Sequence, residues 1–232
     1  MNNKLSIYYM ILSMVFCLSY FVGSCLDIKV IDVFGSFPVS CGIFLIPFMY
    51  VVSDCLVEIY GFKYSCYTMV FTIIIQICIL LIIKIVYLLP PAPYWNGNEH
   101  FSYVFNSTIR TNISAIFAFT TAFLTNAYVM SKMKTIHKGK YFKTRAIVST
   151  IFGELMDSLV FFTLAFLFVI PFDKLLNMIV FNTILKTGYE AILLPITERV
   201  SNYIKEKENI DIYDSDTSYL QAFKNLFINK EF

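Results

Sequence analysis

Charged residues are scarce in this sequence. Asp, Glu, Lys and Arg make up 15% of its 232 residues, while hydrophobic residues make up 58%. Soluble domains carry about 25% charged residues, and a soluble core of this size cannot enclose so many apolar side chains. The composition therefore excludes an ordinary soluble fold. The net charge of +2 offers no basic surface for nucleic acid, which we do not expect as a partner.

Histidine is almost absent, and paired cysteines are missing. The two His residues, His100 and His137, fall in predicted loops, and the six Cys residues form no CxxC pair. Zinc sites depend on clustered Cys and His ligands, and a nucleophilic Ser or Cys needs an adjacent base. We therefore predict no metal site, no cofactor and no catalytic residue.

Long apolar segments fill the chain instead. A transmembrane helix needs about 20 mostly apolar residues, and six such segments alternate with polar or Pro- and Gly-containing connections. We predict an all-α polytopic membrane protein, with one six-helix membrane domain over residues 1–200 and a polar cytoplasmic tail over 201–232. The predicted spans are 7–26, 41–60, 65–89, 109–130, 146–170 and 175–200.

The distribution of basic residues predicts the orientation. Six of the 18 Lys and Arg residues fall between residues 132 and 145. Loops rich in Lys and Arg stay on the cytoplasmic side of a membrane. With this loop inside, six spans place both termini in the cytoplasm and the Pro-rich segment 90–106 outside.

Ionisable side chains within the predicted spans are the informative residues. A charge at mid-bilayer costs about 2.5–3.5 kcal/mol on insertion scales, and it persists where it faces the bundle interior, finds a partner or functions. Residues three or four apart lie on one helix face. Three predicted helices each carry such a pair, namely Asp54 with Glu58, Glu154 with Asp157, and Lys186 with Glu190.

Two interpretations of these charges stay open. In the first, they only neutralise one another, with Lys186 paired to Glu190, Asp157 or Asp54. One Lys leaves several acids without a cation, so in the second interpretation the acids face a transport pathway. Carboxylates accept two parallel N–H donors, such as a guanine-like edge offers. An aromatic side chain such as Tyr50 stacks on a flat ring.

Three motifs follow one another along the chain with the spacing of a known family. They are Pro47-x-x-Tyr50-x-x-x-Asp54-x-x-x-Glu58-x-Tyr60-Gly61, Gly153-Glu154-x-x-Asp157-Ser158-x-x-Phe161-Phe162 and Leu185-Lys186-x-x-Tyr189-Glu190. Together they resemble the queuosine-precursor transporters, also called the vitamin-uptake-like family. The resemblance covers nearly the whole chain and is least clear in segment 90–106.

The resemblance implies an importer in the bacterial plasma membrane. Its substrates would be 7-deazaguanine compounds, such as the 7-cyano or 7-aminomethyl base or queuine, salvaged to make queuosine in transfer RNA. The fold would be similar to the six-helix substrate-binding subunits of energy-coupling-factor transporters. Partners would be the small-molecule substrate and the lipid bilayer, and a homo-oligomer or an ATP-dependent energising module stays open. The candidate substrate residues are Asp54, Asp157 and Lys186, followed by Glu58, Glu154, Glu190, Tyr50 and Asn112.

Two alternative functions also stay open. A substrate-binding subunit for another vitamin-like molecule would present small residues four apart on its first helix. Ser13 and Cys17 fit that pattern, but Tyr9 and Phe21 interrupt it. An intramembrane enzyme could use paired carboxylates as an aspartic dyad, but the predicted spans lack the Tyr-Asp and Gly-x-Gly-Asp contexts of such proteases.

Overall fold

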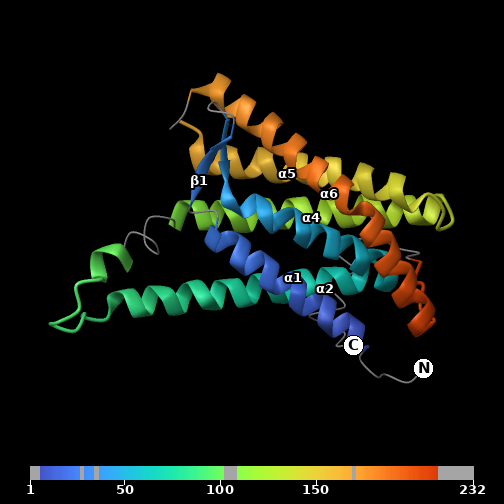
Figure 1. Cartoon of the computed structure of the whole chain (residues 1–232), viewed down its shortest axis with the longest axis horizontal. Coiled ribbons are helices and arrows are strands. Elements are labelled where there is room, and N and C mark those ends of the chain that lie inside the picture. Colours follow the sequence, from blue (N-terminus) through green and yellow to red (C-terminus); the bar gives the residue numbers. More distant parts are fainter. Residues whose placement is uncertain (1–5, 27–28, 34–36, 102–108, 169–170, 214–232) are drawn as a thin grey trace.

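The computed structural model describes residues 6–26, 29–33, 37–101, 109–168 and 171–213. It confirms the all-α bundle (Figure 1). Five described helices are long and apolar enough to cross a membrane. They are α1 (Ile7–Leu26), α2 (Ile46–Leu88), α4 (Ile109–Ile136), α5 (Phe142–Phe166) and α6 (Phe172–Glu208).

A short hairpin lies between α1 and α2, where the sequence predicted only a polar connection, and a 3-10 helix occupies the first residues of the predicted second span 41–60. Strand β1 (Val30–Val33) pairs antiparallel with β2 (Phe37–Ser40), in a register that joins Val30 to Ser40. The 3-10 helix η1 (Cys41–Phe44) follows directly and leads into α2. The hairpin lies at one end of the bundle (Figure 1). It therefore distinguishes that end from the end that carries the turn between α4 and α5.

Helix α2 has two arms joined at Gly61. Its backbone there has φ 82° and ψ 176°, a conformation open almost only to glycine because it has no Cβ. Figure 1 shows the second arm running back from this point and diverging from the first. The arms cover the positions of the second and third predicted spans. Gly61 thus determines where the chain reverses.

We expect Gly61→Ala to destabilise the protein by about 1–3 kcal/mol, because the reversal holds alanine in a strained conformation. Thermal unfolding of the purified protein in detergent measures the loss. Gly188→Ala is the matched control, since Gly188 lies in α6 and a Cβ there meets nothing within 4 Å. An equal effect of the two substitutions would contradict the role of Gly61.

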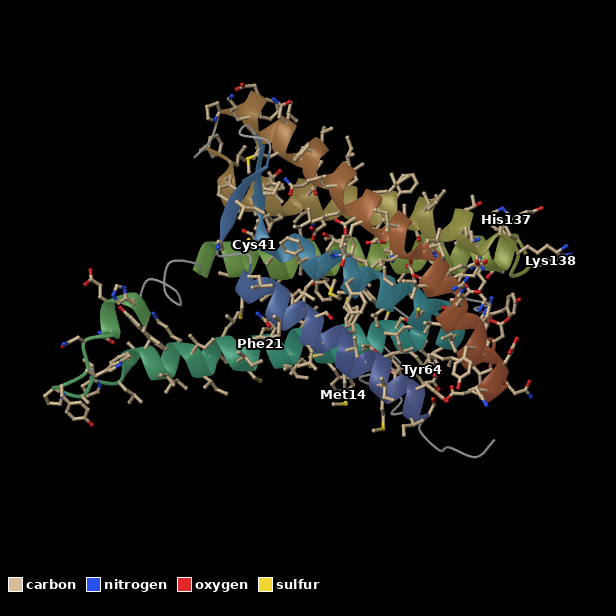
Figure 2. The ribbon with its side chains drawn as sticks, viewed as in Figure 1. Met14, Phe21, Cys41, Tyr64, His137 and Lys138 are labelled. Atoms are coloured by element: carbon tan, nitrogen blue, oxygen red, sulfur yellow. The ribbon has the colours of Figure 1, made fainter. Side chains whose placement is uncertain are left out.

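Helices α4 and α5 pack against each other across a tight turn. Lys138, Gly139 and Tyr141 in this turn all have positive φ, and Figure 2 labels His137 and Lys138 at this end of the bundle. The basic loop that the sequence predicted over 132–145 is mostly helical, because α4 continues to Ile136 and α5 begins at Phe142. Only residues 137–141 separate the two helices.

Burial is inverted relative to a soluble protein. Large apolar side chains such as Met14 and Leu81 are exposed, whereas Asp54, Glu154 and Arg145 are buried. The exposed row on α1 includes Met14, which is labelled in Figure 2. Lipid accommodates apolar side chains but leaves polar groups unsatisfied, so polar groups gather inside the bundle. The chain is a multi-pass membrane protein.

Candidate substrate site

A cavity of about 130 Å³ lies in the half of the bundle that carries the hairpin. An engineered cavity of about 150 Å³ in another protein binds benzene, so this space suits a small flat ring. Its lining comes from the end of β2, from η1 and from the helices α1, α2, α4, α5 and α6. Its aromatic lining residues are Tyr20, Tyr50, Phe119, Phe161, Phe162 and Phe166.

One ion pair gives the cavity its charge. Asp157 on α5 and Lys186 on α6 both line it, and Lys186 Nζ lies 2.5 Å from Asp157 Oδ2. A second acid, Glu154 on α5, has Oε2 at 3.1 Å from the same ammonium. Both side chains of the lining pair remain 12–14% exposed, compared with 1% for Glu154. The Asp157–Lys186 pair therefore faces the cavity, and Glu154 lies behind it.

Helix spacing explains why these groups meet. Glu154 and Asp157 are three residues apart on α5 and so share one face. That face packs against α6, where Lys186 reaches both carboxylates. The Lys186 ammonium is thus paired across helices, with acids of α5 rather than with Glu190 one turn along its own helix.

Tyr50 adds a polar group to the aromatic wall. It is 2% exposed, and its hydroxyl has no hydrogen-bond partner within the described part of the chain. Further along α5, the cavity-lining Phe162 and Phe166 have ring centroids 6.0 Å apart and planes inclined by only 29°. A flat ligand can stack on such a surface while its edge meets the charges.

Asp54 and Glu190 do not line this cavity. They line a separate niche of about 10 Å³, enough for one water molecule. Asn126 Nδ2 donates to Asp54 Oδ1 at 2.9 Å, and the Thr150 hydroxyl donates to Glu190. Asp54 and Glu190 are therefore separated from the predicted site residues that line the cavity. The side chain of Asn112 lies outside the described residues.

Glu58 lies in a third place, close to the turn between α4 and α5. Arg145 binds its carboxylate through two nitrogens, at 2.7 and 3.1 Å, and Lys205 Nζ lies 2.6 Å from Oε1. Arg145 also donates to the carbonyl oxygens of Lys140 and Gly139 in the turn. Glu58 is therefore neutralised by Arg145 of α5 and Lys205 of α6, and it does not line the cavity.

Lys134 belongs to the same polar cluster, although the sequence counted it as a loop charge. It is 1% exposed, and its Nζ lies 2.5 Å from the Glu58 carbonyl oxygen and 2.6 Å from Asp211 Oδ1. The missed signal was helical spacing, because Asn126, Met130 and Lys134 are four residues apart and all buried.

The segment after α6 lies against this cluster. The Ile212 amide donates to the Ile59 carbonyl at 3.2 Å, and a Cβ on Gly139 would collide with the Tyr213 hydroxyl. Partial burial raises the pKa of Asp211, but hydrogen bonds from Lys134 and Lys205 outweigh it and hold the pKa below its usual value. Asp211 is therefore ionised at neutral pH and anchors the segment; acidification through its lowered pKa would release it.

Comparison with known proteins gives one match. A family model described as "Putative vitamin uptake transporter" matches residues 40–200. The match covers well over half of the chain and includes Asp54, Glu58, Asp157, Lys186 and Glu190. No curated protein and no solved structure matches the chain.

Proposed function

The chain belongs to the vitamin uptake transporter family, and from this premise we propose that it imports 7-deazaguanine precursors of queuosine across the bacterial plasma membrane. The observation that carries the proposal is the Asp157–Lys186 pair in an aromatic cavity of about 130 Å³. A fused ring with N–H donors along one edge matches both the space and its polar groups. The substrate is moved and not chemically changed.

Substrate recognition would use the charged pair directly. The Asp157 carboxylate accepts two neighbouring N–H donors, and Lys186 donates to a ring carbonyl. The Tyr50 hydroxyl supplies one more polar contact, while Phe162 and Phe166 stack against the ring. Glu154 maintains the position of the Lys186 ammonium when substrate draws Asp157 away from it.

The two ends of the bundle support a direction of transport. Basic loops stay in the cytoplasm, which places the turn at residues 137–141 and both termini inside. The cavity then lies in the outer half, and the Glu58 cluster closes the inner end. Release into the cytoplasm requires the contacts of Arg145 and Lys205 with Glu58 to rearrange.

An uptake assay tests this proposal. Cells that make no queuosine precursor, expressing this chain, receive each deazaguanine base singly, and queuosine is then measured in their transfer RNA. We expect at least one base to restore it. If no base is taken up by cells with confirmed membrane expression, the proposed substrate is wrong.

We expect Asp157→Asn to lower the uptake rate at subsaturating substrate by about tenfold or more, because a charged hydrogen bond contributes about 1.5–3 kcal/mol. Asp173→Asn is the control, since Asp173 is an exposed residue in the first turn of the neighbouring helix α6. Labelled-base uptake at equal expression measures both. Undiminished uptake by Asp157→Asn would remove Asp157 from the site.

The family description also favours a second candidate, a substrate-binding subunit for another vitamin-like molecule that works with an ATP-dependent module. Such a subunit needs a face on which its partner packs closely. The exposed residues of α1 include large ones, Met10, Met14 and Leu18, which keep a partner helix at a distance. Transport by the purified chain alone in liposomes would exclude this candidate.

A further inference from the structure

Glu190 has a buried carboxyl group that lines the niche and takes no part in the substrate cavity. Glu190 is 5% exposed, and its Oε1 atom has no hydrogen-bond partner among the described residues. Its other oxygen accepts a hydrogen bond from Thr150. The niche beside it holds about 10 Å³ of free space, lined also by Asp54 and the hydroxyl-bearing Thr187 and Thr197.

The charges around Glu190 do not balance. The titratable groups facing it are Asp54 and Tyr50 from α2, Glu154 from α5 and Lys186 from its own helix. Lys186 is the single cation among these, and it is already paired with two acids of α5. A buried carboxylate without a cation is so unfavourable that such a group takes up a proton instead.

The other buried cations of the described chain are engaged elsewhere. Arg145 and Lys205 bind Glu58, and Lys134 binds Asp211. A space for about one water would also admit a small metal ion, so the available ligands decide whether one binds there. The described residues contain no group of three or more His, Cys, Asp and Glu side chains that could hold one.

We propose that Glu190 is a proton-binding site and that its proton enters the cell together with the substrate. Buried carboxyls commonly serve as proton relays in transporters. The niche provides a place for a water that exchanges the proton with Glu190.

The charge state of Glu190 affects the substrate cavity through Lys186. When Glu190 is protonated it is neutral, and Lys186 stays paired with Asp157 and Glu154; when Glu190 is ionised, it attracts the same ammonium. Loss of the proton therefore perturbs the pair that lines the substrate cavity, which couples the two sites. The coupling rests on the proposed import function, whereas the proton site does not.

Infrared spectroscopy of the substrate-free protein in lipid tests the proton site by itself. We expect the wild-type protein at neutral pH to show the carbonyl band of a protonated, buried carboxylic acid. Glu190→Gln should lose that band, and the control Glu206→Gln, an exposed position on the same helix, should keep it. Because Gln closely resembles a protonated Glu in shape, the variant should fold, which its thermal unfolding verifies. A band unchanged in Glu190→Gln overturns the proposal.

Uptake into liposomes under an imposed proton gradient tests the coupling. With one proton per substrate, each pH unit supports up to about tenfold accumulation, and Glu190→Gln should reduce the accumulation ratio to about one. Wild-type accumulation that follows a sodium gradient and ignores pH would overturn proton coupling. A wild-type protein that transports no deazaguanine base refutes the import function instead. The infrared band alone then decides whether Glu190 binds a proton.

Discussion

Lys186→Met is expected to abolish uptake and to lower the free energy of unfolding by about 3–5 kcal/mol. The Lys186 ammonium is the cation between Asp157 and Glu154. Its removal leaves the buried Glu154 and the half-buried Asp157 without a cation, and breaking a buried ion pair at one side is strongly destabilising. Thermal unfolding in detergent and labelled-base uptake at equal expression measure the two effects.

A triple variant separates the structural role of Lys186 from its role in transport. Adding Asp157→Asn and Glu154→Gln to Lys186→Met removes all three charges, so most of the lost stability should return. Uptake should stay absent, because the cavity then has neither an anionic acceptor nor a cationic donor. Lys174→Met, at an exposed position earlier in α6, should change neither quantity. Recovered uptake in the triple variant would show that the charges only stabilise the fold.

Arg145→Met is expected to lower the free energy of unfolding by about 3–5 kcal/mol. Arg145 is fully buried and binds Glu58 through two nitrogens, so its loss leaves the buried carboxylate with Lys205 alone. Lys143→Met is the matched control two residues earlier in α5. The Lys143 side chain is 58% exposed and pairs with Glu198, and such a surface pair contributes about 1 kcal/mol or less.

The measurement is the unfolding midpoint of both variants in the same detergent. Equal midpoints would show that Arg145 is no more important to stability than a surface residue. The larger loss for Arg145 would show instead that the contacts of Glu58 with Arg145 and Lys205 stabilise this end of the bundle. Uptake by any folded Arg145→Met protein would then report whether the same contacts also control substrate release.

Much of the fold could be predicted because lipid imposes a simple requirement. Backbone groups in a bilayer must be satisfied within their own segment, so long apolar segments become helices. Helix α1 lies over 7–26, where the sequence places its first span. The ends of helices were harder to predict. Helix α4 continues to Ile136 and α5 begins at Phe142, because the buried ends of Lys134 and Arg145 are paired with the carboxylates of Asp211 and Glu58 and need no water.

By itself the sequence determined that the chain is a helical membrane protein, and it predicted that the charged residues of its second, fifth and sixth spans face the interior, although it missed the buried Lys134 and Arg145. Helical spacing gives both, since it depends on one helix at a time. The tertiary structure alone decided which charges meet. Lys186 pairs with α5 rather than with Glu190, Glu58 pairs with Arg145, and Asp54 lies in the niche rather than the cavity. These choices depend on how each helix is rotated against partners far away in the sequence, and the periodicity of a single helix contains no information about that rotation.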